Sequence, residues 1–160
     1  MIIVGIDPGT TRIGFGVILS KDGDLKYLDS GYINLESADP QKRLFYIFKE
    51  ISSLIKRVKP DIVGVEKVFF SKNKKTALEV SEARGVIVAA VLNHQVSVRH
   101  YTPLQVKQAV STYGAADKKE VQKMVSIILD LEKPPEPDDV ADALAVAICC
   151  SQQNWEEKII

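Results

Sequence analysis

Carboxylates stand at the ends of two apolar segments of the chain. Asp7 ends the apolar run 2–6, and Glu66 ends the run 62–65 in the same way. A carboxylate beside a buried strand loses hydration, which is unfavourable unless a cation or hydrogen bonds replace the lost water. Taken alone, Asp7 could cap the turn at 8–11, and Glu66 could pair with a nearby lysine. Two such ends in one small domain favour a shared divalent cation instead.

A second acidic pair, Asp139 and Asp142, stands near the C-terminal end of the sequence. The two residues are three positions apart, so they share one face of the helix expected there. Acids are favoured in the first turn of a helix, which is enough to explain Asp139 and its neighbour Asp138. It explains Asp142 less well, because the other residues between 140 and 148 are all apolar. We therefore interpret the pair as functional.

The donor chemistry of these acids indicates which ion they would hold. Carboxylate oxygens are hard ligands that select magnesium or manganese rather than zinc. Two such ions close together can activate a water and stabilise the leaving oxygen of an in-line displacement. His94 and His100 lie far from the acidic motifs in the sequence, and no serine stands in a nucleophile-elbow pattern. The acids thus point to metal-dependent phosphodiester chemistry.

The composition is that of an ordinary globular protein. The 160 residues are 46% hydrophobic and 26% charged, which suits one domain spanning 1–160 but not comfortably two. We find no apolar run long enough to span a membrane and no signal peptide, so we expect a cytoplasmic protein. Cys149 and Cys150 are adjacent on a predicted helix, where their side chains diverge, and we expect them to be buried and reduced.

The charges balance but are unevenly distributed. The formal net charge is zero, from 21 basic and 21 acidic side chains, which argues weakly against a nucleic-acid-binding protein. Lysines gather at 67–75 and 107–123, whereas many acids lie towards the C-terminal end. This distribution is compatible with a basic face beside an acidic metal pocket.

The pattern of apolar residues predicts an α/β domain. Three strands with tight turns, at 2–7, 13–20 and 25–35, suggest an antiparallel meander. The later elements are helices at 44–58, 76–93, 103–109, 118–131 and 138–152 and strands at 62–66 and 96–101. This order predicts a mixed five-stranded sheet, an antiparallel meander plus parallel strands, with helices on both faces. Asp7 would lie on the central strand, with Glu66 at the end of the fourth strand and the last helix packed across both.

Several short motifs are weak alone but specific in their joint order and spacing. They are Gly5-Ile6-Asp7-Pro8-Gly9, Gly14-Phe15-Gly16-Val17, Glu66-Lys67-Val68-Phe69, Lys72-Asn73, Ala83-Arg84-Gly85-Val86, Gln105-Val106-Lys107-Gln108 and Asp142-Ala143-Leu144-Ala145. Through them the chain resembles, over most of its length, the RuvC-type Holliday-junction resolvases. These are crossover junction endodeoxyribonucleases of the ribonuclease-H-like superfamily, and the resemblance implies that fold.

The resemblance also implies a site and a reaction. Its catalytic metal ligands map onto Asp7, Glu66, Asp139 and Asp142, with Asp139 preferred to Asp138 because it stands three residues before Asp142. They would hold two Mg2+ ions per subunit, with Mn2+ as a substitute. A homodimer would resolve four-way DNA junctions by symmetric paired nicks with 5′-phosphate ends, in homologous recombination and DNA repair. A branch-migration helicase complex of the RuvA/RuvB type is the implied partner.

Aromatic and basic residues are the expected DNA contacts. Phe69 and Phe70 stand in a lysine-rich segment directly after Glu66, where they could stack on unpaired bases. Lys107 and Lys118 match basic positions of the family near the cleaved strand. The full expected set is Phe69, Phe70, Lys72, Lys74, Lys75, Arg84, Lys107, Lys118 and Lys119. The alternatives are that one of the two Phe residues packs in the core and that the lysines are ordinary solvated side chains.

The helix at 77–93 is a candidate dimer interface. Its residues Ala77, Val80, Ser81 and Gly85 are small enough to permit close approach of a second copy. Ordinary packing of this helix on the sheet is the alternative.

Other functions share parts of this pattern. Residues 7–11 followed by Gly14 resemble the first phosphate loop of the sugar-kinase, heat-shock and actin superfamily. Those proteins close two domains around a nucleotide, however, and 160 residues supply only one, with no second phosphate loop. A RuvC-like factor in RNA processing and a non-catalytic DNA-binding module are further alternatives, and the presence of four acids argues against the second.

Overall fold

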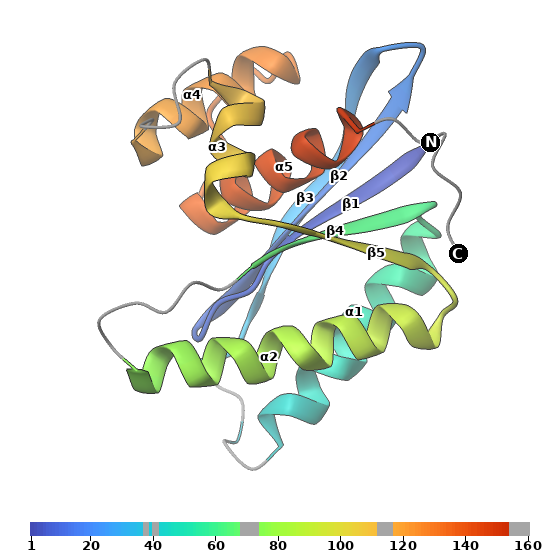
Figure 1. The fold of residues 1–160 in the computed structure, drawn as a ribbon, viewed down its shortest axis with the longest axis vertical. Helices are drawn as coiled ribbons and strands as arrows, with labels where there is room; N and C mark the ends of the chain where they lie inside the picture. Colours follow the sequence, from blue (N-terminus) through green and yellow to red (C-terminus); the bar gives the residue numbers. More distant parts are fainter. Residues whose placement is uncertain (37–38, 40–41, 68–73, 112–116, 154–160) are drawn as a thin grey trace.

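A five-stranded mixed β-sheet forms the middle layer of the computed structural model, which describes residues 1–36, 39, 42–67, 74–111 and 117–153 (Figure 1). The predicted antiparallel meander consists of β1 (Ile2–Asp7), β2 (Arg12–Lys21) and β3 (Asp24–Asn34). On the other side of β1, the strands β4 (Ile62–Glu66) and β5 (Ser97–Tyr101) pair in parallel. The strand order is β3-β2-β1-β4-β5, so β1 is the central strand, as predicted.

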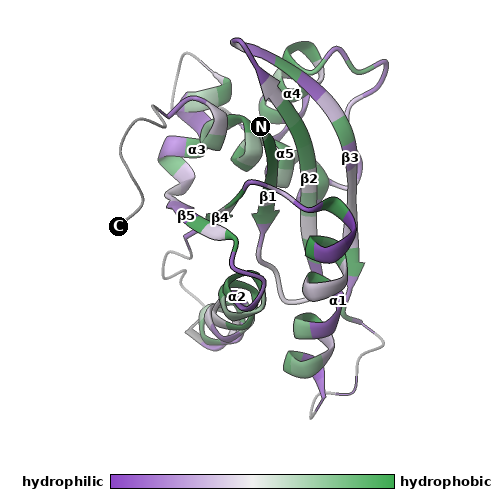
Figure 2. Ribbon diagram, turned by 90° about the vertical axis from the view of Figure 1, so that its right-hand side faces the viewer, coloured by the Kyte–Doolittle hydropathy of each residue, from purple (hydrophilic) through white to green (hydrophobic). Residues whose placement is uncertain are grey.

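Helices cover both faces of this sheet, as Figures 1 and 2 show from two directions. One face carries α1 (Arg43–Val58) and α2 (Lys74–Asn93), and the other carries α3 (Pro103–Val110), α4 (Lys118–Ile128) and α5 (Asp138–Ser151). Side chains alternate along β1, so Ile3 packs in the core under α3–α5 while Val4 and Ile6 pack in the core under α1 and α2. None of the described helices is long and apolar enough to cross a membrane.

Most predicted elements lie where the sequence pattern indicated, and the differences are at their ends. The strands 2–7 and 62–66 have the predicted bounds. The helix expected at 118–131 ends at Ile128, because Asp130 adopts a left-handed backbone conformation with φ of 51°. α1 ends before Lys59, which takes the same conformation directly before Pro60.

Three glycines lie side by side across the sheet beneath α5. Gly5 of β1 pairs with Gly16 of β2 on one side and with Gly64 of β4 on the other. A Cβ added at Gly5 would overlap the carbonyl oxygen of Ala143, and one at Gly16 would come within 2.6 Å of the Leu144 side chain. Because glycine has no side chain, α5 rests directly on the main chain of the strands.

The same close approach fixes the acidic end of α5. Asp7 pairs with Gly14 across β1 and β2. A Cβ added at Gly14 would overlap the carbonyl oxygen of Asp139, so the first turn of α5 lies against the end of this strand pair. Asp7 is in phase with Ile3 and Gly5, which places its side chain on the α5 face of the sheet.

The variant Gly5→Ala tests this packing. Its methyl group would meet helix backbone, which cannot rotate aside, and overpacking of this kind costs roughly 1–3 kcal/mol or more. We expect the thermal unfolding midpoint to fall by about 2–4 °C for each kcal/mol lost, measured by circular dichroism. The matched control is Gly31→Ala, where the new methyl group would meet the ring of Phe15, which can turn, so the loss should be smaller. Equal midpoints for Gly5→Ala and wild type would contradict direct packing of α5 on the strand.

Candidate active site

Asp7 and Glu66 end two adjacent parallel strands, so their side chains meet at the same edge of the sheet. Their carboxyl groups are close enough to share a hydrogen bond. Burial raises the pKa of Asp7 well above its usual value, and the charges of Glu66 and Asp142 raise it further. Burial also raises the pKa of Glu66, and the charge of Asp142 adds to this rise. The three acids therefore form one electrostatic unit.

Asp142 reaches this unit from α5. Burial raises its pKa to about 6. The positive charges of Lys118 and Lys107 act in the opposite direction, whereas the charges of Asp138 and Asp139 add to the rise. Asp142 is thus a partly buried acid between lysines on one side and carboxylates on the other.

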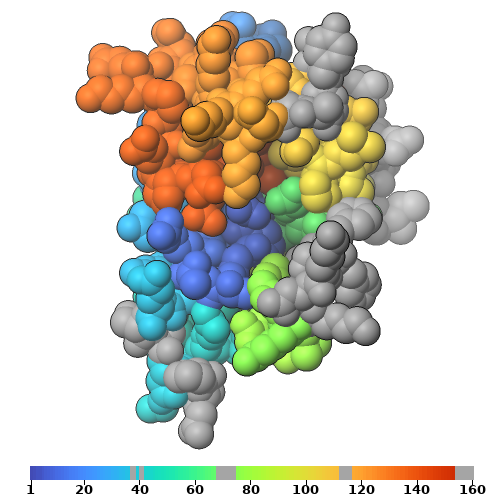
Figure 3. Space-filling model, turned by 90° about the vertical axis from the view of Figure 1, so that its left-hand side faces the viewer, coloured from blue at the N-terminus to red at the C-terminus, as the bar shows by residue number. Residues whose placement is uncertain are grey.

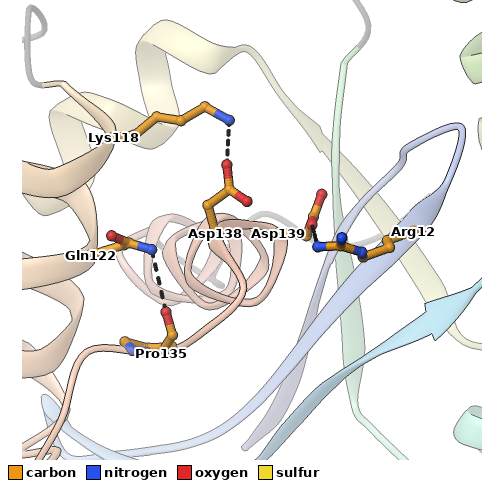
Figure 4. A network of polar contacts seen from close by, with 6 residues as sticks. All are labelled: Arg12, Lys118, Gln122, Pro135, Asp138 and Asp139. Atoms are coloured by element: carbon orange, nitrogen blue, oxygen red, sulfur yellow. Dashed lines mark hydrogen bonds and ion pairs between the residues drawn. The ribbon is translucent and has the colours of Figure 1, made fainter.

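Asp138 and Asp139 are neighbours in sequence but have different partners (Figure 4). Lys118 Nζ donates a hydrogen bond of 2.6 Å to Asp138 Oδ2, and this bond lowers the pKa of Asp138. Asp139 Oδ2 lies 3.5 Å from Arg12 Nη1, and the charge of Asp139 contributes to the raised pKa of Asp7. The fold therefore turns Asp138 towards α4 and brings Asp139 into the field of Asp7, which is the arrangement expected if Asp139 is the functional acid.

The four acids fit a divalent cation in charge and in donor type. They bring only oxygen donors from three elements. Burial, with the charges of neighbouring acids, raises the pKa of Asp7, Glu66 and Asp142, so a bound cation would relieve an unfavourable interaction. As the side chains stand, no three His, Cys, Asp or Glu residues in the described ranges enclose a metal position. The fit therefore rests on charge and donor chemistry and not on a preformed cage.

A cavity of about 190 Å³ opens beside the acids. Its lining residues are Glu66, Asp142, Lys107 and Lys118, with Pro103, Val106 and Val121 as the apolar wall. Figure 3 views the face where the end of β1 (blue), β4 (green), α3 (yellow) and the starts of α4 and α5 (orange) meet. Two ammonium groups beside two carboxylates can bind a phosphate close to a metal position.

Local sequence signals place the two lysines. The start of α3 is fixed by a reciprocal capping box, in which the Thr102 hydroxyl accepts from the Gln105 backbone and the Gln105 side chain accepts from the Thr102 backbone. Lys107 follows on the next turn. Asp117 caps α4 in the same position, and Lys118 is the first residue of that helix.

The remaining predicted DNA contacts are only partly described. Phe69, Phe70 and Lys72 lie outside the described residues. Lys74 and Lys75 begin α2, and Lys119 is an exposed residue of α4 that does not line the cavity.

Arg84 is held against the sheet. Its Nη2 lies 2.8 Å from Nδ1 of His100, which belongs to β5, and its Nε is buried without a partner within the described structure. Burial and the charges of Arg84 and Lys67 lower the pKa of His100, so the neutral ring can accept a hydrogen bond from the guanidinium. The predicted role of Arg84 in DNA binding would thus use a side chain that His100 orients.

Two residues of the site were missed by sequence reasoning. Arg12 contacts Asp139 and lies over the ring of Tyr32, with its guanidinium carbon 5.6 Å from the ring centre. The only signal in the sequence is that Arg12 is a basic residue shortly after the Asp7 turn. Tyr32 lies on β3 and gives no signal of its own.

Comparison with known proteins decides the family. The sequence profile described as crossover junction endodeoxyribonuclease RuvC matches residues 3–150. The chain belongs to this family. The protein of this name from Caldicellulosiruptor saccharolyticus is 48% identical over 151 residues, which cover 93% of this chain and 91% of that protein. The one from Clostridioides difficile is 47% identical over 161 residues, with coverage of 100% and 95%.

A solved structure agrees with this result. T. thermophilus RuvC in complex with Holliday junction substrate has a TM-score of 0.83 and 34% identity, covering 93% of this chain and 92% of that chain. The predicted RuvC family, ribonuclease-H-like fold and activity class are confirmed: the chain is a Holliday-junction-resolving nuclease of recombination and repair. Family membership also argues against the nucleotide-binding and RNA-processing alternatives.

The metal-free protein should become less stable as the pH rises. An aspartate whose pKa is higher in the folded chain stabilises the fold while protonated, so this contribution is complete below about pH 4 and is lost as the pH rises through about 6. For Asp142 the loss is on the order of 1–3 kcal/mol. The variant Asp142→Asn lacks this titrating group. Its free energy of unfolding, measured with urea in EDTA, should therefore fall less than that of the wild type between pH 5 and 7.5.

The matched control is Asp24→Asn, an exposed residue at the start of β3 that should keep the wild-type pH dependence. Adding Mg2+ at pH 7.5 should stabilise the wild type more than Asp142→Asn, because the ion binds only the folded site. Identical pH dependence of wild type and Asp142→Asn would contradict the electrostatic account of the site.

Proposed function

We propose that this chain cuts four-way DNA junctions by metal-dependent hydrolysis at Asp7, Glu66, Asp139 and Asp142. The main support is the convergence of these four acids from β1, β4 and α5 beside a cavity with two lysines. The raised pKa values of three of the acids are typical of a site that binds a cation. The T. thermophilus relative solved with a Holliday junction substrate supports the choice of DNA.

In this proposal the acids hold two Mg2+ ions, with Mn2+ as a substitute. When bound, the ions supply an activated water and stabilise the oxygen that leaves. Attack on phosphorus breaks its bond to the 3′ oxygen, so the products are a 5′-phosphate and a 3′-hydroxyl that a ligase can rejoin.

The lysines of the cavity act on the phosphate in the proposed reaction. Lys107 and Lys118 approach Glu66 and Asp142 from α3 and α4, where they can neutralise charge that develops on the phosphate oxygens. The hydrogen bond of Lys118 to Asp138 keeps its ammonium near the cavity. Phe69, Phe70, Lys72, Lys74, Lys75, Arg84 and Lys119 remain proposed contacts to the junction.

We further propose that two copies act together, because one site cuts one strand and a symmetric pair of nicks needs two. The exposed face of α2 supports this pairing. Leu78 is 63% exposed, Leu92 is 54% exposed, and an added Cβ at Gly85 between them meets nothing within 4 Å. These positions are seven residues apart and so share one helix face. Ala77 of the predicted interface is buried within the chain, so the exposed face of α2 does not include it.

The cellular setting is proposed from family membership alone. The bacterial relatives named crossover junction endodeoxyribonuclease RuvC match nearly the whole chain. We place the protein in the cytoplasm, with a branch-migration helicase complex of the RuvA/RuvB type as partner.

The decisive experiment compares an immobile four-way junction with a linear duplex of matching sequence, with and without Mg2+. We expect paired symmetric nicks on the junction only, and only with the ion. Asp7→Asn should lower cutting by about 100-fold or more, because it removes a charged ligand at the centre of the site. Its junction affinity should stay within about threefold of wild type, because DNA affinity depends mostly on phosphate contacts. Asp24→Asn is the matched control, and equal cutting by Asp7→Asn and wild type would refute the proposal.

A charge on the exposed face of α2 should separate the proposed dimer. Leu92→Glu would bury a carboxylate in an apolar interface, so we expect a monomer by sedimentation equilibrium and single nicks in place of paired ones. Ile127→Glu is the matched control, since Ile127 is 62% exposed on α4, and it should leave the assembly unchanged. A Leu92→Glu protein that stays dimeric would place the interface elsewhere.

A further inference from the structure

We infer that Arg12 binds a phosphate of the strand being cut, on the side of the acids opposite Lys107 and Lys118, and that Tyr32 supports it there. This inference rests on the proposed junction cleavage and adds a substrate contact to it. Arg12 begins β2, directly after the turn that follows Asp7, so its backbone position is tied to the central acid.

The placement of Arg12 across α5 from the lysines is the first observation. Figure 4 shows Lys118 with Asp138 on one side of the start of α5 and Arg12 with Asp139 on the other. A strand laid over the acids would leave the site on both sides, and its phosphates there would need cations. Lys118 lies where the strand would leave the acids on one side, and Arg12 lies where it would leave them on the other.

The free bonding capacity of Arg12 is the second observation. The 3.5 Å between its Nη1 and Asp139 Oδ2 is an ion-pair distance, at the long limit for a hydrogen bond. A guanidinium has five N–H donors in a planar fork that matches the oxygens of a phosphate. The Arg12 side chain is 37% exposed, so donors remain that the Asp139 contact does not use.

The Tyr32 ring restricts where the guanidinium can go. The ring lies on β3, 46% exposed, with the Arg12 guanidinium carbon 5.6 Å from its centre. Cation–π contact and the Asp139 charge hold Arg12 from two sides, so it loses less freedom when it binds a phosphate. Holding Asp139 in place is the competing role, but a partly exposed ion pair contributes little to stability by itself.

The salt dependence of junction binding tests the contact. The variants are made in the Asp7→Asn background, so that the junction stays intact with Mg2+ present, and affinity is followed by fluorescence anisotropy. Loss of one phosphate contact should lower the slope of log affinity against log salt by about 0.9. Arg12→Gln should show this smaller slope, and Arg12→Lys should keep the slope of the Asp7→Asn parent. Arg57→Gln on α1, which breaks the ion pair between Arg57 and Asp29 of β3, is the matched control with no expected change.

Uncharged replacements of single phosphates identify the position on the DNA that Arg12 contacts. Methylphosphonates replace the phosphates flanking the cut site one at a time, and each junction is tested with both proteins. One replacement should weaken binding by the protein with Arg12 and have no further effect on Arg12→Gln. Equal losses for both proteins at every position would overturn the inference.

Cutting by otherwise wild-type protein separates the contact from the competing role. With protein below saturation, Arg12→Gln should cut more slowly than wild type, and most of this loss should disappear as the protein concentration rises to saturation. An unchanged salt slope with a slower rate would make Arg12 a positioning residue for Asp139 and refute the phosphate contact. Tyr32→Phe should match the wild type in salt slope, whereas Tyr32→Leu should move towards Arg12→Gln. If the wild type fails to cut junctions, the proposed function fails, while the slopes still report whether Arg12 touches DNA.

Discussion

Contact between the main chain of α5 and the main chain of the sheet is the constraint on which this site depends. Gly5, Gly16 and Gly64 form a row across three strands beneath α5, and at Gly5 the helix backbone lies directly against the strand backbone. The distance between the two backbones is then set by van der Waals radii. Because Gly14 continues this contact to the start of α5, the acids of the helix reach the acids of β1 and β4.

Electrostatic repulsion is the result of this close packing. Burial and the charge of Glu66 raise the pKa of Asp7 at the ends of adjacent strands, and Asp142 has a pKa of about 6 because it is removed from water and lies near other acids. Lysines from α3 and α4 compensate one side of the group, and Arg12 compensates the other. Function and stability therefore oppose each other here, since the charges that would hold an ion destabilise the folded chain when no ion is bound.

Local patterns explain what the sequence could predict. The apolar runs that end in Asp7 and Glu66 are short and uninterrupted, so the bounds of both strands were predicted correctly. The contact of Arg12 with Asp139 depends on the rotation of α5 over β2, which no local pattern records. The exposed face of α2 was misassigned at Ala77 because that helix carries small and apolar residues on all sides, so periodicity does not say which side faces out. The pairing of Arg84 with His100 joins α2 to β5 and is likewise visible only in three dimensions.

The sheet also acts as a spacer. The acids lie on the face of the sheet that α5 covers. The other face of the same strands packs against α1 and α2. Two copies that meet through α2 would carry their acids away from each other, separated by the thickness of both sheets and both α2 helices. The separation of the two cuts would then be a property of the protein, fixed before any DNA arrives. A junction with tightly stacked arms would have to spread until its two strands match that distance, so the fold would select branched DNA by its dimensions as well as by its charge.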